Sequence, residues 1–446
     1  MKPRKTTLAL LLAAGFVGSA WGADLLSVYR DALAYDAQFA AARATLEAGR
    51  EKLPQARAGL LPAISLSSST TWNDADSQRR TDGAQLYSAK YNSNGWSVTL
   101  TQPLFRWQNW EAYNQGELQV VQAEAQFGLA RQDLMVRVAQ AYFDVLLARE
   151  VVATSAAQKA AIAEQLESAK RNFEVGTATI TDTHEAQSRY DLAVATEIAA
   201  RNDLEVKEQA LRTITGKDET ALKSLRPGVL IPPPQPAEIG KWAEAAESSN
   251  FSVQSAQAGL EIAAREISRQ RAGHYPTVDL VVARNHNAAT GGLSSAQITG
   301  AGSDSNASTI GLQLAIPIFS GGLTVSRERE AAALRDRALA DLENARRSAA
   351  LQARQAYLGV TSGLSQVRAY EAALTSSRSA LESNRLGYEV GVRINIDVLN
   401  AQSQLYDTRQ KLAKARLDTL VAQLRLKAAA ATLSEEDLAA INSLLE

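Results

Sequence analysis

The 446-residue chain has no cysteine, only three histidines, and no apolar run of about 18 residues beyond its N-terminal segment. The absence of cysteine excludes a disulfide framework, a thiolate metal site and a lipid-modified N-terminal cysteine. The absence of a long apolar run excludes a membrane-spanning helix in the rest of the chain. Any contact with a membrane must therefore come from another part of the fold.

Catalytic motifs are also missing. His184, His274 and His286 lack the His-Glu-x-x-His spacing of a zinc site. Gly321 and Gly322 lie at a predicted bend, and no Gly-Lys-Ser/Thr phosphate loop accompanies them. The dense charges along the predicted helices are typical of a solvated helix face. The sequence therefore predicts no enzyme activity, no metal site and no cofactor.

Residues 1–23 have the composition of a secretory signal peptide. Three basic residues precede the apolar run 8–17, and small residues occupy positions 20, 22 and 23. The apolar run is too short for a membrane-spanning helix. Removal of this segment changes the formal net charge from -1 to -4, so nucleic acid is not an expected partner. We expect an exported protein.

The chain contains an internal repeat. An Arg-Ala-Gly-x-x-Pro motif at 57–62 recurs at 271–276. Other landmarks recur at the same offset to within one position: Leu100, Pro103 and Phe105 at Leu314, Pro317 and Phe319, and Ala141-Tyr142 at Ala356-Tyr357. A constant offset indicates two tandem copies. We predict repeat one at 24–226, a Pro-rich linker at 227–240, and repeat two at 237–446, which ends in a C-terminal equatorial segment.

Proline is absent from 104–226 and from 318–446, so both stretches permit very long helices. The predicted long helices are 107–173 and 320–386, followed by 184–214 and 396–431, and shorter helices are expected at 25–57 and 241–272. Apolar or small residues follow the 4-3-4-3-4 spacing of a coiled-coil seam. They are Leu134, Val138, Ala141, Val145, Ala148 and Val152 in copy one, and Ala349, Ala353, Ala356, Val360, Gly363 and Val367 in copy two. A soluble coiled-coil rod is the alternative interpretation.

Each pair of long helices is separated by a Val-Gly break. Val175-Gly176 and Val390-Gly391 are related by the repeat offset, and in each copy an Asp, Asp182 or Asp397, stands six residues after the Gly. A repeated break between repeated helices predicts two antiparallel helical hairpins.

Strands are predicted before each long helix. Apolar and polar residues alternate in four segments, at about 62–72, 95–105, 276–286 and 308–319. Alternation fits either a soluble antiparallel sheet or a membrane barrel. Four tryptophans near the expected strand ends favour the barrel, as do long polar loops at 73–94 and 287–309; the interfacial aromatics are Trp72, Trp96, Trp107 and Trp110. A closed barrel needs about eight strands or more, so a dimer or a trimer is required.

The chain resembles the TolC family of outer membrane efflux and type I secretion channels. The resemblance covers essentially the whole mature chain and lies in the repeated Arg-Ala-Gly-x-x-Pro entries, the segments 102–105 and 316–322, and the two Val-Gly breaks. It implies a mixed α/β membrane protein with a tandem-repeat protomer, four transmembrane β-strands and long coiled-coil-like α-helical hairpins. Three such protomers form a twelve-stranded β-barrel continued by an α-helical barrel.

The resemblance also implies a function and partners. The protein is expected to be a passive exit duct of a tripartite efflux pump or type I secretion system, a homotrimer in contact with outer membrane lipid and extending into the Gram-negative periplasm. A periplasmic adaptor (membrane fusion) protein and an inner-membrane transporter would dock at the helix tips. The alternative function is that of a periplasmic coiled-coil adaptor or structural rod.

Site residues follow from the matching positions. The resemblance implies a periplasmic gate formed by Thr181 and Asp182 of copy one with Tyr388 and Arg393 of copy two. It also implies a pore-entrance ring of acidic residues at Asp397 and at the position of Asn400, where the family's best-known members have a second acid. Asp397 is also expected to act as a helix N-cap.

Overall fold

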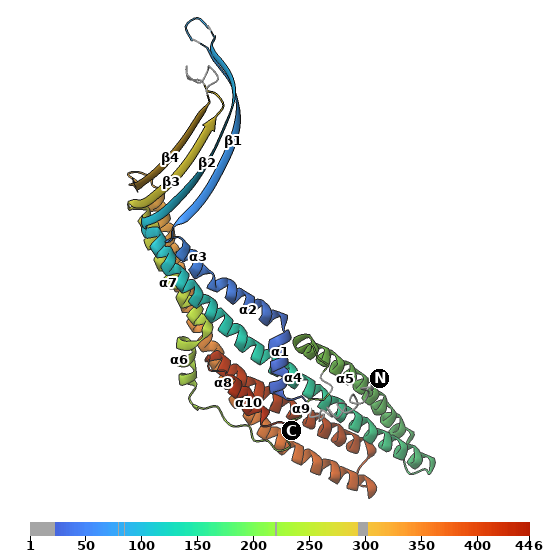
Figure 1. Cartoon of the computed structure of the whole chain (residues 1–446). Coiled ribbons are helices and arrows are strands. Elements are labelled where there is room, and N and C mark those ends of the chain that lie inside the picture. Colours follow the sequence, from blue (N-terminus) through green and yellow to red (C-terminus); the bar gives the residue numbers. More distant parts are fainter. Residues whose placement is uncertain (1–22, 79, 84, 219–220, 293–301) are drawn as a thin grey trace, which may run out of the picture. The chain divides into compact units, whose positions relative to one another are not determined.

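The computed structural model describes residues 23–78, 80–83, 85–218, 221–292 and 302–446. The predicted signal peptide lies outside these ranges, apart from Ala23. The chain forms two compact units, each assembled from both copies of the repeat (Figure 1). The helical unit comprises Met1–Ala42, Gly128–Asn250 and Arg347–Glu446, and the sheet unit comprises Arg43–Phe127 and Phe251–Arg346.

The sheet unit contains a four-stranded antiparallel sheet in the order β1-β2-β3-β4 (Figure 1). The strands are β1 (Ala63–Gln78), β2 (Gln85–Phe105), β3 (Thr277–Ala289) and β4 (Ser303–Ala315). The two copies meet where β2 pairs with β3, with Thr99 opposite Ala283. β1 and β4 are the edges, and in the described part of the chain neither has a second neighbouring strand. The predicted pair of strands in each copy is confirmed.

The strands extend beyond the predicted segments. β1 and β2 continue into 73–94, the segment predicted to be a polar loop, and Asn73 pairs there with Tyr91. Polar side chains support this extension, since Asn92 Nδ2 donates to Thr70 Oγ1 over 2.9 Å. Backbone pairing requires no apolar face, so alternation alone underestimated the strands. β4 ends before Pro317, which cannot donate to a strand ladder.

The tryptophans are therefore placed differently from expectation. Trp72 lies within β1 opposite Asn92, and Trp96 lies within β2, where its ring stacks on His286 at a centroid distance of 6.0 Å. The predicted strand-end position is wrong for these two residues because the strands are longer. Trp107 and Trp110 lie in the first residues of α4, directly after β2 ends.

Large apolar side chains on the edge strands are exposed in the single chain. Ile64 and Leu66 of β1 are 70% and 71% exposed, and Ile310 and Leu312 of β4 are 77% and 70% exposed. These residues follow the period of two and lie on alternate positions of each strand. A protein surface rarely leaves such a face uncovered, which indicates a lipid or protein contact there.

Long helices dominate the rest of the chain. The helical unit holds α1 (Leu25–Tyr35), α5 (Ile180–Thr215), α6 (Ile239–Ser249), α9 (Asn395–Ala429) and α10 (Glu435–Asn442), and the sheet unit holds α3 (Lys52–Ala58), α7 (Phe251–Arg271) and the 3-10 turn η1 (Ala272–His274). α2 (Ala37–Arg50), α4 (Trp107–Glu174) and α8 (Leu323–Glu389) contribute to both units. Among the described helices, none is long and apolar enough to cross a membrane.

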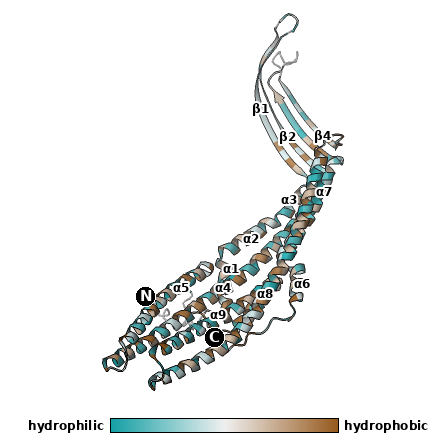
Figure 2. Ribbon diagram, turned by 180° about the vertical axis from the view of Figure 1, so that it is seen from behind, coloured by the Kyte–Doolittle hydropathy of each residue, from teal (hydrophilic) through white to brown (hydrophobic). Residues whose placement is uncertain are grey.

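The helical unit buries the predicted seams. Leu134, Val138 and Val145 of α4 have no exposed surface, and Val360 of α8 has none. Hydrophobic residues are interspersed with polar ones along both helices in Figure 2, because one stripe packs inward while the rest stays solvated. At Gly363 a Cβ atom would lie 2.4 Å from Thr419 Oγ1, so α8 and α9 approach closely at this glycine.

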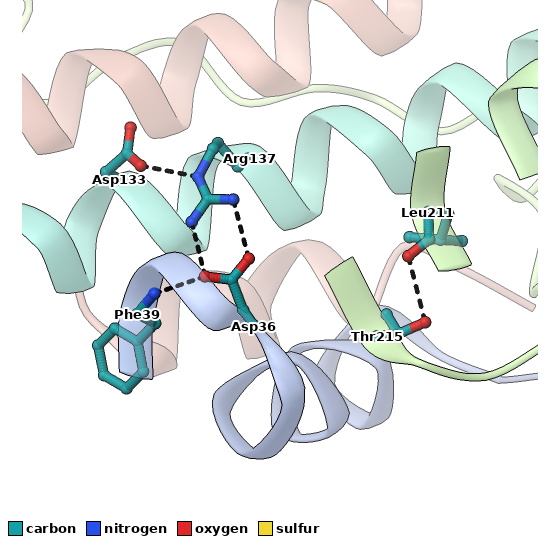
Figure 3. A network of polar contacts seen from close by, with 6 residues as sticks. All are labelled: Asp36, Phe39, Asp133, Arg137, Leu211 and Thr215. Atoms are coloured by element: carbon teal, nitrogen blue, oxygen red, sulfur yellow. Dashed lines mark hydrogen bonds and ion pairs between the residues drawn. The ribbon is translucent and has the colours of Figure 1, made fainter. Parts of the chain in front are cut away.

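The first helix of each copy, predicted as continuous at 25–57 and 241–272, is broken. α1 ends at Asp36 and α6 ends at Asn250, the equivalent position of copy two, and both residues have extended backbone and are buried. Asp36 accepts from both terminal guanidinium nitrogens of Arg137 at 3.0 and 3.1 Å and from the Phe39 N–H at 2.6 Å (Figure 3). Asn250 Nδ2 donates to the Ala429 carbonyl at 2.8 Å. Side chains that bond to backbone and to other helices thus end both helices.

Asp36 and Glu266 are anionic side chains that join helices within their units. Burial opposes the charge of Asp36, but hydrogen bonds from Arg137 and from the Phe39 N–H outweigh it and hold the pKa of Asp36 below its ordinary value. In the sheet unit, burial likewise opposes the charge of Glu266, and hydrogen bonds from Arg269, Gln115 and Gln270 lower the pKa of Glu266 to about 2. Glu266 thereby ties α7 to α4.

Candidate gate at the tips of the helical hairpins

Both long helices end at a glycine with a left-handed backbone. Gly176 after α4 and Gly391 after α8 each have a φ of 77°. The Thr177 N–H donates to the Asn172 carbonyl over 2.8 Å, and the equivalent bond of copy two has the same length. The left-handed conformation favours glycine, so the Val-Gly signal identifies the same turn in both copies.

The helices that follow the two turns begin differently. α5 has a capping box, in which Thr179 is the N-cap and exchanges hydrogen bonds with Asp182. α9 has Ile394 at the N-cap, which has no capping side chain. Asp397 lies in the first turn of α9, so the prediction that Asp397 is the N-cap is wrong. The repeated Asp keeps its position in the first turn of the helix, where a negative charge stabilises the helix N-terminus. Copy two has lost the capping partner, because Ile394 stands where copy one has Thr179.

Three side-chain hydrogen bonds join the hairpin α4–α5 to the hairpin α8–α9 at their tips. Asn172 Nδ2 donates to the Tyr388 hydroxyl at 3.0 Å, and Arg189 donates to Asn400 Oδ1 at 3.0 Å. The third bond runs from the Gln165 amide to Asn395 Oδ1. These contacts hold two separate hairpins together with few polar groups.

An apolar cluster, the tip cluster, packs next to these bonds. Its buried members are Ile162, Leu166, Ala169, Ala186, Ala193 and Leu399, with Tyr190 and Ile396 packed against it. Members come from α4, α5 and α9, so the inner face of α9 rests on the other hairpin. Separation of the two hairpins would expose this cluster, so the cluster stabilises their contact.

The predicted gate residues make fewer contacts with one another than expected. Thr181 is exposed, and Asp182 bonds to Thr179 within its own helix. Within the described ranges, no hydrogen bond or ion pair joins either residue to Tyr388 or Arg393 of the same chain. Of the four, only Tyr388 bonds across to the other hairpin, through Asn172.

Arg393 lies against Gly387 near the end of α8 and forms an ion pair with Asp397, a residue of the predicted entrance ring. Its Nη1 lies 3.5 Å from Asp397 Oδ2, and a Cβ added at Gly387 would lie 2.7 Å from its Cγ. The guanidinium therefore partly neutralises Asp397. Asn400, one turn further along α9, accepts a hydrogen bond from Arg189.

Sequence reasoning missed Gln165, Asn172, Arg189 and Asn395. Arg189 stands seven residues after Asp182, two helical turns along the same face, which was a usable signal. Asn172 aligns with Gly387 at the repeat offset, so comparison of the two copies would have shown a polar residue on one side only. Nothing in the spacing of Gln165 or Asn395 distinguishes them from other helix positions.

Further from the tip, an ion-pair triad joins α4 to α5. Lys159 and Arg201 both contact Glu197, each at 2.5 Å, and Glu197 is buried. Hydrogen bonds from Lys159 and Arg201 lower the pKa of Glu197. The hairpin α4–α5 is thus held internally by charge. Among the described residues, no group of three histidine or acidic side chains is placed to hold a metal ion.

The chain is similar along most of its length to known outer membrane proteins. The model of the outer membrane efflux protein family matches residues 28–217 and 242–432. The outer membrane protein TolC of Vibrio cholerae is 33% identical over 442 residues, covering 98% of each chain. The alkaline protease secretion protein AprF of Pseudomonas aeruginosa is 33% identical over 423 residues, covering 94% of this chain and 86% of the other.

A solved structure shows the same fold. The CmeC outer membrane channel of Campylobacter jejuni matches with a TM-score of 0.79 and 16% identity, covering 95% of this chain and 90% of the other. The family match falls on two segments, one in each copy of the repeat.

Proposed function

This chain belongs to the outer membrane efflux protein family and is an outer membrane efflux or secretion channel of a Gram-negative bacterium, and on this premise we propose that three copies form one passive exit duct. Channels of this family are non-enzymatic transport proteins that work as trimers with pump components. In the proposed duct, cargo enters at the helix tips and leaves through the barrel.

The open sheet carries this proposal. β1 and β4 leave both edges without a partner in the described part of the chain, and Ile64 and Ile310 expose an apolar face on those strands. Unpaired strand edges are not tolerated in lipid, and a closed barrel needs about eight strands or more. Pairing of β1 with β4 of the next copy closes the sheet, and three copies provide twelve strands.

The tips form the proposed gate. Tyr388 lies in the last turn of α8 and Arg393 in the loop after it, while Thr181 and Asp182 lie in the first turn of α5. The bond of Tyr388 with Asn172 supports a role at the tips. Surface polar contacts are each worth about 0.2–1 kcal/mol, so a ring of three copies favours closure without making it permanent. A periplasmic adaptor protein and an inner-membrane transporter are the proposed partners that open it.

Asp397 and Asn400 form the proposed entrance ring. In a threefold assembly three copies of Asp397 present a ring of acids, which attracts cations. Arg393 lies close enough to weaken this charge, and Asn400 contributes no charge of its own. We therefore propose a ring that selects cations weakly.

The assembly is tested by purification of the mature chain. We expect it to require detergent and to have the mass of three chains after subtraction of bound detergent. Its mobility on gels is expected to change on heating, because the closed barrel unfolds only when heated. A soluble, elongated monomer obtained without detergent would overturn the duct and support the alternative of a periplasmic rod.

A further inference from the structure

Buried polar atoms without partners are concentrated at the helix tips. Seven buried side-chain nitrogen or oxygen atoms in the described residues have no hydrogen-bond partner, and three of them lie at the tips. These three are Thr183 Oγ1, Asn395 Nδ2 and Gln402 Oε1. Buried polar groups are normally paired, so an unpaired cluster in one place points to a function.

Asn395 and Gln402 share the inner face of α9. They are seven residues apart, which places them two turns apart on one side of the helix, and their exposed fractions are 1% and 7%. Leu399 lies between them, is fully buried and belongs to the tip cluster. Asn395 and Gln402 therefore face the hairpin α4–α5.

The two amides are only partly satisfied in this interface. Asn395 Oδ1 accepts a hydrogen bond from Gln165, while Asn395 Nδ2 has no acceptor and Gln402 Oε1 has no donor among the described residues. Both atoms are buried within a single chain. Solvent or another copy therefore reaches them only when α9 moves away from α4 and α5.

This arrangement has opposite consequences for the closed and open tip. In the closed tip the two unpaired atoms have lost their hydrogen bonds to water and gain none from the protein. This cost in free energy destabilises the contact. When α9 separates, both atoms become hydrated and this loss is recovered. The apolar tip cluster and the Gln165–Asn395 bond favour the closed state, while the unpaired Asn395 Nδ2 and Gln402 Oε1 oppose it.

We propose that Asn395 and Gln402 are positioning residues of the gate, which weaken the contact of α9 with the hairpin α4–α5 so that a docked partner opens it easily. The proposal rests on the gate described under the proposed function. In this proposal the two amides favour opening of the tip. The Asn172–Tyr388 bond has the opposite effect, since its loss favours opening.

The cleanest variant is Gln402→Met, which keeps the length and volume of the side chain and removes the unpaired oxygen. Gln404→Met is the matched control, because Gln404 is exposed on the same helix. For Asn395, the paired variant Gln165→Met with Asn395→Leu removes both partners together, so that no new unpaired group remains.

Opening is measured by the reactivity of a buried thiol. The chain has no cysteine, so Ala186→Cys introduces a single thiol in the tip cluster, where Ala186 is fully buried. In detergent-purified trimers, Gln402→Met is expected to slow maleimide labelling of this thiol about tenfold and to lower the open probability in planar bilayers. Gln404→Met is expected to change neither.

The outcomes separate this inference from the gate itself. If Tyr388→Phe raises conductance while Gln402→Met leaves labelling unchanged or faster, the role of the amides is overturned and the gate stands. If Tyr388→Phe also has no effect, the proposed gate fails. A Gln402→Met chain that does not assemble into trimers also contradicts the inference, since a better satisfied closed tip must be at least as stable.

Discussion

At the scale of single residues, the polar side chains that matter in this protein join different helices. Asp36 ends α1 and binds Arg137 of α4, and Arg189 of α5 binds Asn400 of α9. Each contact fixes two elements with one pair of groups. Removal of one partner is expected to lower the free energy of unfolding more when the pair is buried than when it is exposed.

The Asp36–Arg137 pair is expected to be a large contributor to stability. Asp36→Ala removes two hydrogen bonds to Arg137 and one to the Phe39 N–H, and leaves a largely buried guanidinium without its main partner. We expect a loss of about 2–4 kcal/mol in the free energy of unfolding, measured by urea unfolding in detergent. Asp133→Ala, which removes the more exposed partner of Arg137 shown in Figure 3, is the control and should cost less than about 1 kcal/mol.

Glu266 predicts an acid-dependent loss of stability. Its folded pKa of about 2 is below the ordinary value of 4.5, so its contribution is fully present above pH 4.5 and is lost as the pH falls toward 2. We expect the difference in melting temperature between the wild type and Glu266→Gln to shrink over this range. A difference that stays constant from pH 5 to about pH 2 would show that the Glu266 charge does not stabilise the fold.

The entrance ring predicts the response to divalent cations. Asp397→Ala is expected to weaken block of single-channel current by Mg²⁺ several-fold, because the acidic ring is lost. Asn400→Asp is expected to deepen the block only modestly, since Arg189 already contacts this position and would pair with the new acid. Equal block in the wild type and Asp397→Ala would remove Asp397 from the ion path.

Single residues were only partly predictable from the sequence. The roles proposed for Tyr388, Arg393 and Asp397 come from a resemblance, and the repeat offset marked the two Val-Gly turns and the position of Asp397. The partners Asn172, Gln165 and Arg189 were missed, since each bond joins residues that are far apart in the sequence. The amphipathic pattern of one helix does not specify which residue of another helix it meets.

At the scale of elements, the long hairpins depend on close approach at small residues. Gly363 of α8 lies against Thr419 of α9, and a Cβ there would overlap the Thr419 hydroxyl at 2.4 Å. Small seam residues in copy two therefore bring its two helices nearer than large ones would permit. The sequence predicted this from the spacing of alanine and glycine.

A substitution at this seam tests the close approach. Gly363→Val is expected to destabilise the hairpin α8–α9 by about 1–3 kcal/mol through overpacking, measured as a fall in melting temperature. Gly359→Ala is the matched control, because its Cβ would meet Ala422 Cβ at an ordinary 3.8 Å and alanine favours the helix. A Gly363→Val protein as stable as Gly359→Ala would show that the helices can move apart freely.

Element boundaries were predicted well where backbone chemistry decides them. The helix ends at Gly176 and Gly391 follow from glycine, whereas β4 ends at Ala315, before Pro317, and not at the predicted residue 319. The breaks at Asp36 and Asn250 and the extended strands were missed. In both cases polar side chains support structure that a search for apolar periodicity does not detect.

At the scale of the whole molecule, the chain is incomplete by itself. Its sheet has two open edges in the described residues, and its tips carry polar contacts that are individually weak. The central claim is that three copies complete the barrel and that these tip contacts keep the duct closed until a partner opens it. In a threefold ring each weak contact occurs three times, so that together the contacts favour the closed duct.

Single-channel conductance in planar lipid bilayers tests this claim most directly. The wild-type trimer is expected to conduct poorly if, as proposed, the tip contacts keep the duct closed. Tyr388→Phe combined with Arg393→Glu removes the hydroxyl that accepts from Asn172 and places a second acid beside Asp397, so a several-fold rise in conductance is predicted. A conductance equal to that of the wild type, in trimers of normal stability, would contradict the gate at the helix tips.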